Sequence, residues 1–587
     1  MALRFTVKGV GVTGQSTEFA NVVLRAGVCT GGVAGTVYEF DPGQDSQPTL
    51  GYGPLAVADC RAAALVPNAQ RYALKVAATQ AGTISTVTQS GSGPLITVAG
   101  ETIDGISDSP FIAANVKVRV AKGGALGTAR VDIALDGARF NYTLDVPAHG
   151  PPTVIGTVDV TGFTWGSGGT LDGLTFIIGA ATCTFADPAD EADMLAQLET
   201  AIAGYSFDLV QGKYLRVRKD TAGGASTFTI NATSTSDGTL GVSNTAATGS
   251  DSSITIPGTG FPITFPAGTY VEKEIYSFTT TAPRTSLAAL MAALTTAGND
   301  FTIDFGLDMF AQAPLDEVDA RAYTDALDAL HATWETQTDK RFAFWLANTP
   351  LDLSDAAIKL AYATSTASRH GAMAHQDCWL PSVLPQPIGN LRAPLVEQLA
   401  IRCASYSFSE DPGCGEFGPL ECSLAAPAGT PLARNEATAD IKMGTSTGPG
   451  FTTMGSKRGK PFFTRGVTRA GSTGPLSRFV DVGVARATKA ISAVIWMALG
   501  KFENKTFTLN ADGTMLEGDA SAIDTAFNTE CRGKFVPNHF SSFRCRVVRA
   551  EKVSDTRNFT VQWTAQIRGQ GEDVTGELSI VGTVEVQ

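Results

Sequence analysis

The sequence predicts a multidomain protein of mixed α+β and α/β class, with an α/β core, inserted β-rich domains and extended N- and C-terminal β-arms. Three observations lead to this prediction. Helical and buried-strand patterns alternate in residues 25–80 and return in residues 276–374, which is typical of an α/β core. Between them, residues 81–275 are rich in Ser, Thr and Gly and carry short strand patterns, so they indicate an insertion. Both ends of the chain alternate polar and apolar residues, as strands with one buried face do.

The two strand-like ends are expected to act as arms, covering residues 1–24 and 575–587. The alternation also runs through the segment around Trp563 and resumes after a Gly-Gln-Gly-Glu-Asp turn. A terminal strand either completes the sheet of its own chain or offers an unpaired edge to another chain, and the pattern leaves both alternatives open. The apolar positions that would anchor the arms are Phe5, Val7, Leu578, Ile580, Val584 and Val586.

The first part of the core and the insertion follow in chain order. In the core, a Gly-Tyr-Gly-Pro turn precedes a helical pattern over residues 55–65, and residues 72–77 follow as a strand. In the insertion, residues 129–135 alternate as a strand that ends at an Asp-Gly turn. A sub-module is expected at about 168–245, where residues 189–203 form an amphipathic helix. The apolar stripe of that helix is Met194, Leu195, Leu198 and Ile202.

The second part of the core, residues 276–374, repeats the α/β pattern. The expected elements are a helix at 285–296, a strand at 301–305, a long helix at 315–338 and a strand at 342–346. The last of these is apolar throughout, which predicts a strand that is buried on both faces.

A C-terminal domain is predicted over residues 375–574, with a Pro/Gly-rich lead-in that reaches Gly474. Its expected elements are a largely helical stretch at 479–502, a short helix at 520–530, and strands at 543–552 and 558–568. The apolar run at 490–499 is too short to span a bilayer, so it indicates a core or interface helix.

Composition excludes some classes of protein. The net charge is −13, whereas a dedicated nucleic-acid-binding domain should be basic. The nine cysteines are scattered and odd in number, which indicates reduced thiols and synthesis in a cytosol. The first residues lack the apolar core of a signal peptide. We therefore expect neither nucleic-acid binding nor membrane insertion.

Two motifs approach catalytic or metal-binding chemistry without reaching it. Residues 450–457 resemble a phosphate-binding loop, but Ser456 and Lys457 stand in the reverse of the required order. His370, His375, Cys378 and Cys403 lie near one another in sequence but lack the short paired spacings of zinc sites. We expect a protein that is not an enzyme and that has no cofactor and no metal.

The order of segments resembles that of contractile phage tail sheath subunits. Leu50 to Leu55 open the first helix after an extended arm, and Gly268 to Pro283 resemble the segment in which the chain returns from inserted domains. Arg478 to Ile491, followed by a short helix, a strand and a terminal hairpin, are similar to the sheath C-terminal domain. The resemblance spans most of the chain and is carried by segment order.

The resemblance implies a mechanical function. Sheath subunits form hexameric rings that stack helically around a tail tube, and their arms add strands to the sheets of neighbouring subunits. Baseplate triggering then shortens the sheath without nucleotide and drives the tube through a cell envelope during genome ejection. The implied partners are further copies of the chain, the tail tube protein, and baseplate and tail terminator proteins. The implied location is the virion tail, after synthesis in the host cytoplasm.

A basic segment lies within this acidic chain. Between Phe451 and Lys501 there are nine Lys and Arg residues and one acid. Arg478, Arg486 and Lys489 are therefore candidates for contact with an acidic tube surface. The alternative is a solvated face with local ion pairs.

Two other functions remain open from the sequence. A tail-fibre, baseplate or adhesin protein could use the β-rich insertion to bind cell-surface glycan. A polysaccharide-degrading enzyme would need a pair of carboxylates in a cleft, and their separation is not visible in sequence.

Overall fold

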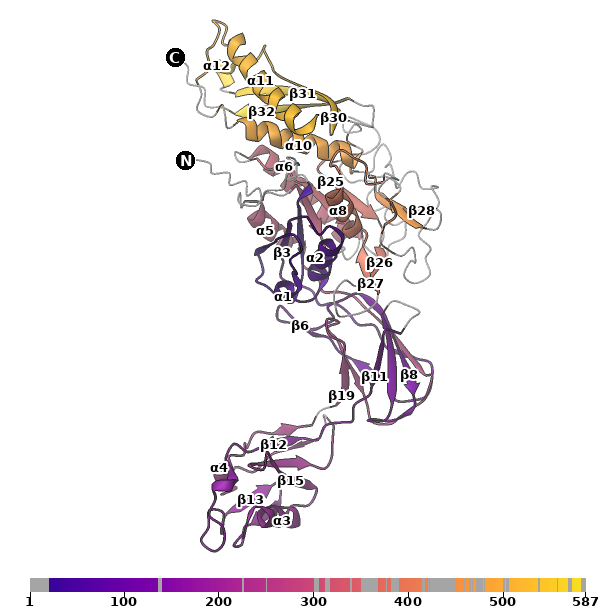
Figure 1. Ribbon diagram of the computed structural model, residues 1–587, viewed down its shortest axis with the longest axis vertical. Helices are drawn as coiled ribbons and strands as arrows, with labels where there is room; N and C mark the ends of the chain where they lie inside the picture. The colour runs from indigo at the N-terminus through magenta and orange to yellow at the C-terminus, as the bar shows by residue number, and fades with distance from the viewer. Residues whose placement is uncertain are drawn as a thin grey trace.

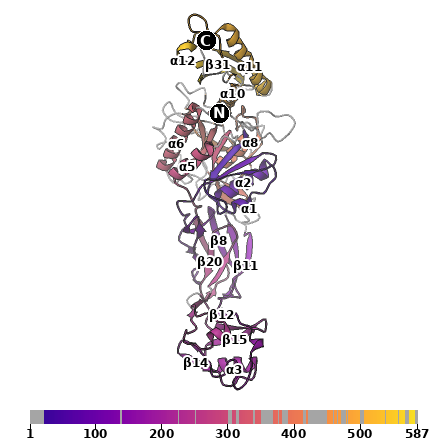
Figure 2. The same ribbon diagram turned by 90° about the vertical axis from the view of Figure 1, so that its left-hand side faces the viewer.

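The computed structural model describes residues 21–135, 140–223, 226–249, 251–299, 306–311, 317–337, 340–349, 368–375, 377–381, 390–413, 418–420, 422, 450–457, 460–463, 466, 468–470, 479, 481–499, 502, 506–536, 539–556, 558–567 and 573–581. They form an elongated molecule of successive units, and Figure 1 shows the C-terminal unit at one end and a small module at the other. The core and a β-rich domain lie between them, in the same order in Figure 2. The multidomain mixture of α and β structure is as the sequence predicts.

The core contains a sheet of eight strands in the order β2-β3-β1-β23-β24-β25-β28-β29. Its inner strands run parallel, and an antiparallel strand lies at each edge. The strands are β1 (Val23–Gly27), β2 (Val37–Phe40), β3 (Arg71–Lys75), β23 (Leu307–Phe310), β24 (Phe344–Asn348), β25 (Gly371–His375), β28 (Thr452–Lys457) and β29 (Lys460–Phe463).

Helices cover both faces of this sheet. One face packs against α2 (Pro54–Leu65) and α8 (Val396–Ser405), and the other against α5 (Leu287–Gly298) and α6 (Glu317–Thr336). Every residue of β24 is buried, which confirms the prediction from its apolar run. The strand expected at 301–305 lies outside the described residues, and the strand found next to it is β23. The remaining elements near the core are α1 (Gln47–Leu50) and the hairpin of β26 (Asp377–Pro381) and β27 (Asn390–Pro394).

The insertion interrupts this sheet between β3 and β23. β1 precedes the insertion and β23 follows it, yet they are parallel neighbours, with Val23 paired to Leu307. The intervening chain leaves the core, forms two further units and returns (Figure 1).

The first inserted unit is a β-rich domain with two main sheets around a shared apolar core. One sheet has the order β11-β10-β8-β22-β4, and the other has the order β19-β20-β5. The strands are β4 (Thr88–Gln89), β5 (Thr97–Val98), β6 (Glu101–Ile103), β7 (Ile106–Ser109), β8 (Ala114–Lys122), β9 (Gly124–Ala125), β10 (Arg130–Leu135), β11 (Tyr142–Asp145), β19 (Ser252–Thr255), β20 (Pro262–Phe265), β21 (Thr269–Tyr270) and β22 (Ile275–Thr280).

The second inserted unit is a distal module nested inside the first. Its helix α3 (Glu191–Ala201) starts at Asp190, whose side chain accepts a hydrogen bond from the backbone of Asp193, and it buries Met194 and Leu198 as expected. The other elements are β12 (Thr153–Ile155), a short 3-10 turn (Val160–Gly162), β13 (Thr175–Ile178), β14 (Ala181–Thr184), β15 (Tyr205–Val210), β16 (Tyr214–Lys219), β17 (Thr227–Phe228), α4 (Asp237–Leu240) and β18 (Ala247–Thr248).

The module is larger than the sub-module expected at about 168–245. β12 pairs with β16, and Val154 and Val160 belong to the apolar core of the module. Its two ends meet, because a side chain on Gly249 would lie 2.7 Å from the carbonyl oxygen of Gly150. The structure therefore places the module between these two glycines.

The C-terminal unit combines helices with a three-stranded sheet in the order β30-β31-β32. Its helix α11 (Glu517–Phe535) is longer than the expected helix at 520–530. The other elements are α10 (Val482–Leu499), β30 (Phe540–Val547), α12 (Val553–Thr556), β31 (Asn558–Ile567) and β32 (Asp573–Val581). No helix in the described part of the chain is long and apolar enough to cross a membrane.

Candidate assembly interface

The C-terminal sheet presents one face to its own unit. On β31, Val561, Trp563 and Ala565 are buried, whereas Gln562 and Thr564 are exposed. This is the alternation predicted from the sequence. The buried side chains pack in one apolar cluster with residues of α10 and α11, including Ile491 and Phe527. The edges of the sheet are therefore where further strands could be added.

β32 lies at one edge and is paired to β31 of its own chain. The antiparallel register runs from Asn558 opposite Val581 to Gln566 opposite Asp573. Among the described residues, no strand pairs with the other side of β32. We call the other side of this nine-residue strand the open edge, because no described strand pairs with it, and α10 packs near β32.

This pairing differs from the expectation that an arm leaves the protomer from Thr575. In the single chain, Leu578 lies opposite Val561 and Ile580 opposite Phe559. The two strands are close in sequence, so forming this hairpin loses less loop-closure entropy than a distant pairing does. Val584, Val586, Phe5 and Val7, the other expected arm anchors, lie outside the described residues.

The hydrogen-bond pattern of the β30-β31-β32 sheet determines which main-chain groups of β32 point outward. Residues of an antiparallel strand alternate between those that bond a given neighbour and those that point away from it. Cys545 of β30 points away from β31 and bonds Asn528 of α11, so the even-numbered residues of β30 bond β31. By the same alternation, odd-numbered residues of β31 bond even-numbered residues of β32. The N–H and C=O groups of Thr575, Glu577 and Ser579 therefore point away from the sheet.

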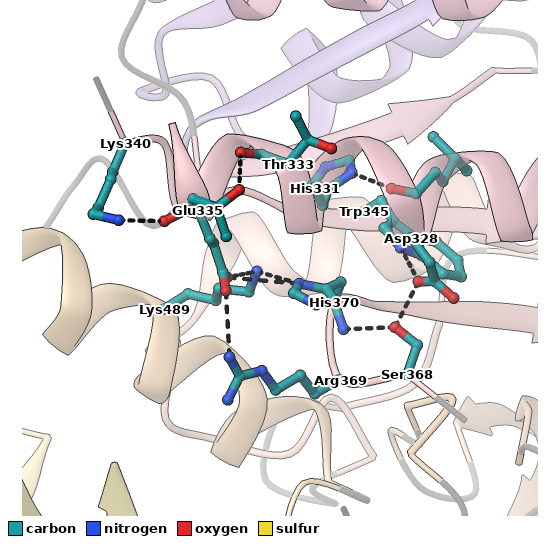
Figure 3. A network of polar contacts seen from close by, with 12 residues as sticks. Asp328, His331, Thr333, Glu335, Lys340, Trp345, Ser368, Arg369, His370 and Lys489 are labelled. Atoms are coloured by element: carbon teal, nitrogen blue, oxygen red, sulfur yellow. Dashed lines mark hydrogen bonds and ion pairs between the residues drawn. The ribbon is translucent and has the colours of Figure 1, made fainter. Parts of the chain in front are cut away.

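A buried polar joint connects the C-terminal unit to the core. Figure 3 shows Lys489 of α10 reaching Glu335 at the end of α6, and the two side chains form an ion pair. Arg369 Nη2 also lies 3.3 Å from Glu335 Oε2. The Lys489 ammonium lies 2.9 Å from Nδ1 of His370. An ammonium can only donate, so this nitrogen accepts and His370 is neutral.

Burial and charge set the protonation of this joint. Burial opposes ionisation of Glu335, but the charge of the Lys489 ammonium outweighs it and holds the pKa of the carboxyl well below its usual range. Burial lowers the pKa of Lys489 against the attraction of Glu335, and burial also lowers the pKa of His370. The joint is an ion pair between two elements far apart in sequence, and no local pattern in the sequence indicates Glu335 as the partner of Lys489.

A second polar chain extends the joint into the core (Figure 3). The backbone N–H of His370 donates to Ser368 Oγ at 3.1 Å. Ser368 Oγ donates to Asp328 Oδ1 at 2.6 Å, and Trp345 Nε1 donates to the same oxygen at 2.8 Å. The network therefore fastens α6 to strand β24 as well as to the C-terminal unit.

The expected tube-contact residues do not form a basic outer face. Lys489 is 5% exposed and Arg486 is 3% exposed, so the prediction for these two is wrong. Arg486 Nη2 donates to Asn21 Oδ1 at 2.8 Å and to the carbonyl oxygen of Cys403 at 2.9 Å. Both cations lie on the inner side of α10, where they bind groups of the core. Arg478, the third candidate, lies outside the described residues.

Arg486 also binds Asn21, the first residue that the structure describes. Asn21 is held between Arg486 of α10 and the carbonyl oxygen of Tyr406, to which its amide donates at 3.2 Å. Asn21, the first described residue, therefore lies at the joint between the core and the C-terminal unit.

The segment that resembles a phosphate-binding loop and the clustered His and Cys residues lie in the core unit. Thr452 to Lys457, in the segment that resembles a phosphate-binding loop, form strand β28 of the core sheet. His375 Nδ1 lies 2.9 Å from Thr349 Oγ1, and burial raises the pKa of the Cys403 thiol. Within the described ranges, no group of three or more His, Cys, Asp or Glu residues is arranged to hold a metal ion.

Comparisons with known proteins give structural matches alone. No protein-family model matches the chain, and no curated protein matches it. A sheath tail protein from Desulfitobacterium hafniense aligns with a TM-score of 0.44 at 12% identity, covering 98% of this chain and all of its own. A sheath tail protein from Listeria innocua aligns with a TM-score of 0.43 at 11% identity, covering 96% of this chain and 98% of its own.

Both of these solved structures are sheath tail proteins, the class that the order of segments resembles.

Proposed function

We propose that this chain is a structural subunit of a contractile tail sheath, which polymerises around a tail tube by pairing strands between copies. The observation that carries the proposal is the open edge of β32, where the main-chain groups of Thr575, Glu577 and Ser579 point outward. Main-chain pairing at such an edge is β-augmentation. The edge of one copy and the added strand of another are different surfaces, so the contact repeats into rings and helices instead of closing as a dimer.

The position of the N-terminal segment supports the same proposal. Asn21, the first described residue, is fastened beside α10, so the expected first arm would be attached next to the C-terminal unit. Donor and acceptor would then lie at one end of the molecule, with the inserted units at the other. In an assembled sheath the distal module would face outward, and hexameric rings would stack around the tube between baseplate and terminator proteins.

Electron microscopy of the purified protein at high concentration tests this function. Long tubes of constant width are expected. Monomers or trimers at every concentration, together with binding of a glycan, would instead support the adhesin alternative.

Contraction without nucleotide is a separate part of the proposal. Tubes are expected to change between a long, narrow form and a short, wide form on mild destabilisation, such as low concentrations of urea, with no ATP added. Tubes that only dissolve under these conditions would show a polymer that does not contract.

Removing the distal module is expected to leave polymerisation intact. The variant joins Gly150 to Gly249 and deletes residues 151–248, because these two glycines are adjacent in the structure. The excised residues have their own apolar core, so the rest of the chain loses little buried surface. Negative-stain microscopy should show tubes of reduced outer diameter. Loss of tubes in a folded variant would show that the module takes part in assembly.

A further inference from the structure

The edge of the C-terminal sheet opposite β32 is already occupied by side chains of α11. The backbone N–H of Cys545 donates to Asn528 Oδ1 at 2.9 Å, and Asn528 Nδ2 donates to the carbonyl oxygen of Cys545 at 2.7 Å. One carboxamide therefore makes the pair of hydrogen bonds that a residue of a neighbouring antiparallel strand would make.

The neighbouring main-chain groups on this edge are bonded in the same way. The N–H of Val547 donates to Asp524 Oδ1 at 2.6 Å, and Arg532 Nε donates to the carbonyl oxygen of Phe543 at 3.0 Å. The carbonyl oxygen of Val547 accepts from Arg549 Nη1 at 2.9 Å. The outward N–H and C=O groups of Cys545 and Val547 and the C=O of Phe543 are thus already paired.

The match follows from the geometry of helix and strand. Asp524, Asn528 and Arg532 are four residues apart, so they lie on one side of α11 about 6 Å apart along its axis. Alternate residues of a strand are about 6.6–6.8 Å apart. A helix that lies along a strand can therefore place one polar side chain at each outward-facing residue. We call Asp524, Asn528 and Arg532 the polar stripe.

Arg549 braces one end of the polar stripe. Its Nη2 donates to Asp524 Oδ2 at 2.8 Å, and its Nε donates to Glu517 Oε2 at 2.9 Å. The hydrogen bond from Arg549 lowers the pKa of Glu517 to about 2, so this carboxylate is charged at neutral pH. The brace holds Asp524 against the N–H of Val547.

We propose that the polar stripe closes the β30 edge against other copies of this chain, so that copies can add strands only at β32. This inference rests on the proposed self-assembly and gives it a direction. A sheet with two open edges could accept a strand on either side, which would allow branched or fused polymers. With one edge closed, every strand that a neighbouring copy adds to this sheet pairs with β32.

The test compares Asn528→Ala and the Asp524→Ala/Asn528→Ala double variant with Thr529→Ala. Thr529 is exposed on α11, and its hydroxyl bonds only within the helix, to the carbonyl oxygen of Thr525. Each protein is assembled at high concentration and imaged. Wild type and Thr529→Ala should form separate tubes of constant width, and the stripe variants should form tubes fused side by side or branched sheets. Stripe variants that form separate, uniform tubes would overturn the proposal.

Hydrogen exchange of dilute, monomeric protein provides the second readout. Loss of the carboxamide leaves the amide of Cys545 without its acceptor, so the peptide covering β30 should exchange about tenfold faster than in Thr529→Ala. Asn528→Asp keeps the acceptor and loses the donor to Cys545, so it should fold well and show an intermediate change. Unchanged exchange in all stripe variants would contradict closure of the edge.

The two proposals fail in different ways. If wild type forms no tubes, the sheath function is wrong. Light scattering of the dilute proteins then still tests whether the polar stripe closes the β30 edge. Greater association of Asn528→Ala than of wild type would support closure by the polar stripe, and equal scattering would reject it.

Discussion

Replacing Glu577 with proline is expected to abolish tube formation while leaving the monomer folded. The N–H of Glu577 points away from β31, so proline removes a donor from the open edge and none from the hairpin. Proline is tolerated on an edge strand when its missing N–H would face solvent. A strand from another copy would lose a hydrogen bond and meet the proline ring at the centre of the edge. Sedimentation and negative-stain microscopy at high concentration measure the result.

Two variants control for other effects of this substitution. Glu577→Ala keeps the N–H and removes the side chain, so it should still form tubes. Leu578→Pro removes an N–H that faces β31, and it should destabilise the C-terminal sheet itself. If Glu577→Pro polymerises as wild type does, β32 is not the assembly edge and the proposed function loses the observation that carries it.

Replacing Lys489 with alanine is expected to destabilise the C-terminal unit by about 3–5 kcal/mol, the usual cost of removing one partner of a buried ion pair. The carboxylate of Glu335 would remain buried with only Arg369 and His370 beside it. The midpoint of urea unfolding, followed by circular dichroism, should fall accordingly. Lys340→Met is the matched control, because Lys340 donates to the main-chain oxygen of Glu335 and lies over the ring of Trp496, so its loss leaves no buried carboxylate without its cation. It should lose about 1 kcal/mol.

The double variant Glu335→Gln/Lys489→Met should recover most of the lost stability, since it leaves no unpaired charge in the joint. If it is as unstable as Lys489→Ala, packing of the lysine chain and not charge accounts for the loss.

Acid should weaken the same joint. The pKa of Glu335 is lowered in the folded protein, so its stabilising contribution is complete above the unfolded carboxyl pKa of about 4.3. It is lost as the pH falls from there towards the lowered folded value. Unfolding midpoints of wild type should therefore decrease below pH 4.3 more steeply than those of the double variant. Parallel pH profiles would contradict this assignment.

The spacing of apolar residues within a single segment predicted several helices and strands and the side that each of them buries. The apolar run of β24, the stripe of α3 and the alternation of β31 each specify which side of an element meets a core. The edge of the distal module could not be predicted in this way, because β12 joins it only through pairing with β16. The continuous alternation of the last strands did not show whether β32 pairs within its own chain.

The basic segment shows why charge counts mislead. Arg486 and Lys489 belong to a run of cations, but their partners, Asn21 and Glu335, are 465 and 154 residues away in sequence. Only the packing of α10 on the core reveals these pairs. The polar stripe, in contrast, was visible as polar residues four apart beside the apolar Ile523, Phe527 and Cys531. The sequence did not reveal that this face would lie along a strand.

Because β1 pairs with β23, which is synthesised much later, part of the core sheet can form only late in synthesis. Val23 cannot pair with Leu307 until the chain has grown by 307 − 23 = 284 residues, so the β1–β23 pair of the core sheet forms late. At ribosomal rates of about 5–20 residues per second, this delay is roughly 15–60 s. The nested units emerge during that interval and can fold on their own apolar cores, while β1 can pair with β3 but not yet with β23. A nascent chain halted before Leu307 should therefore hold both nested units in protease-resistant form and leave the β23-facing side of β1 open to chaperones.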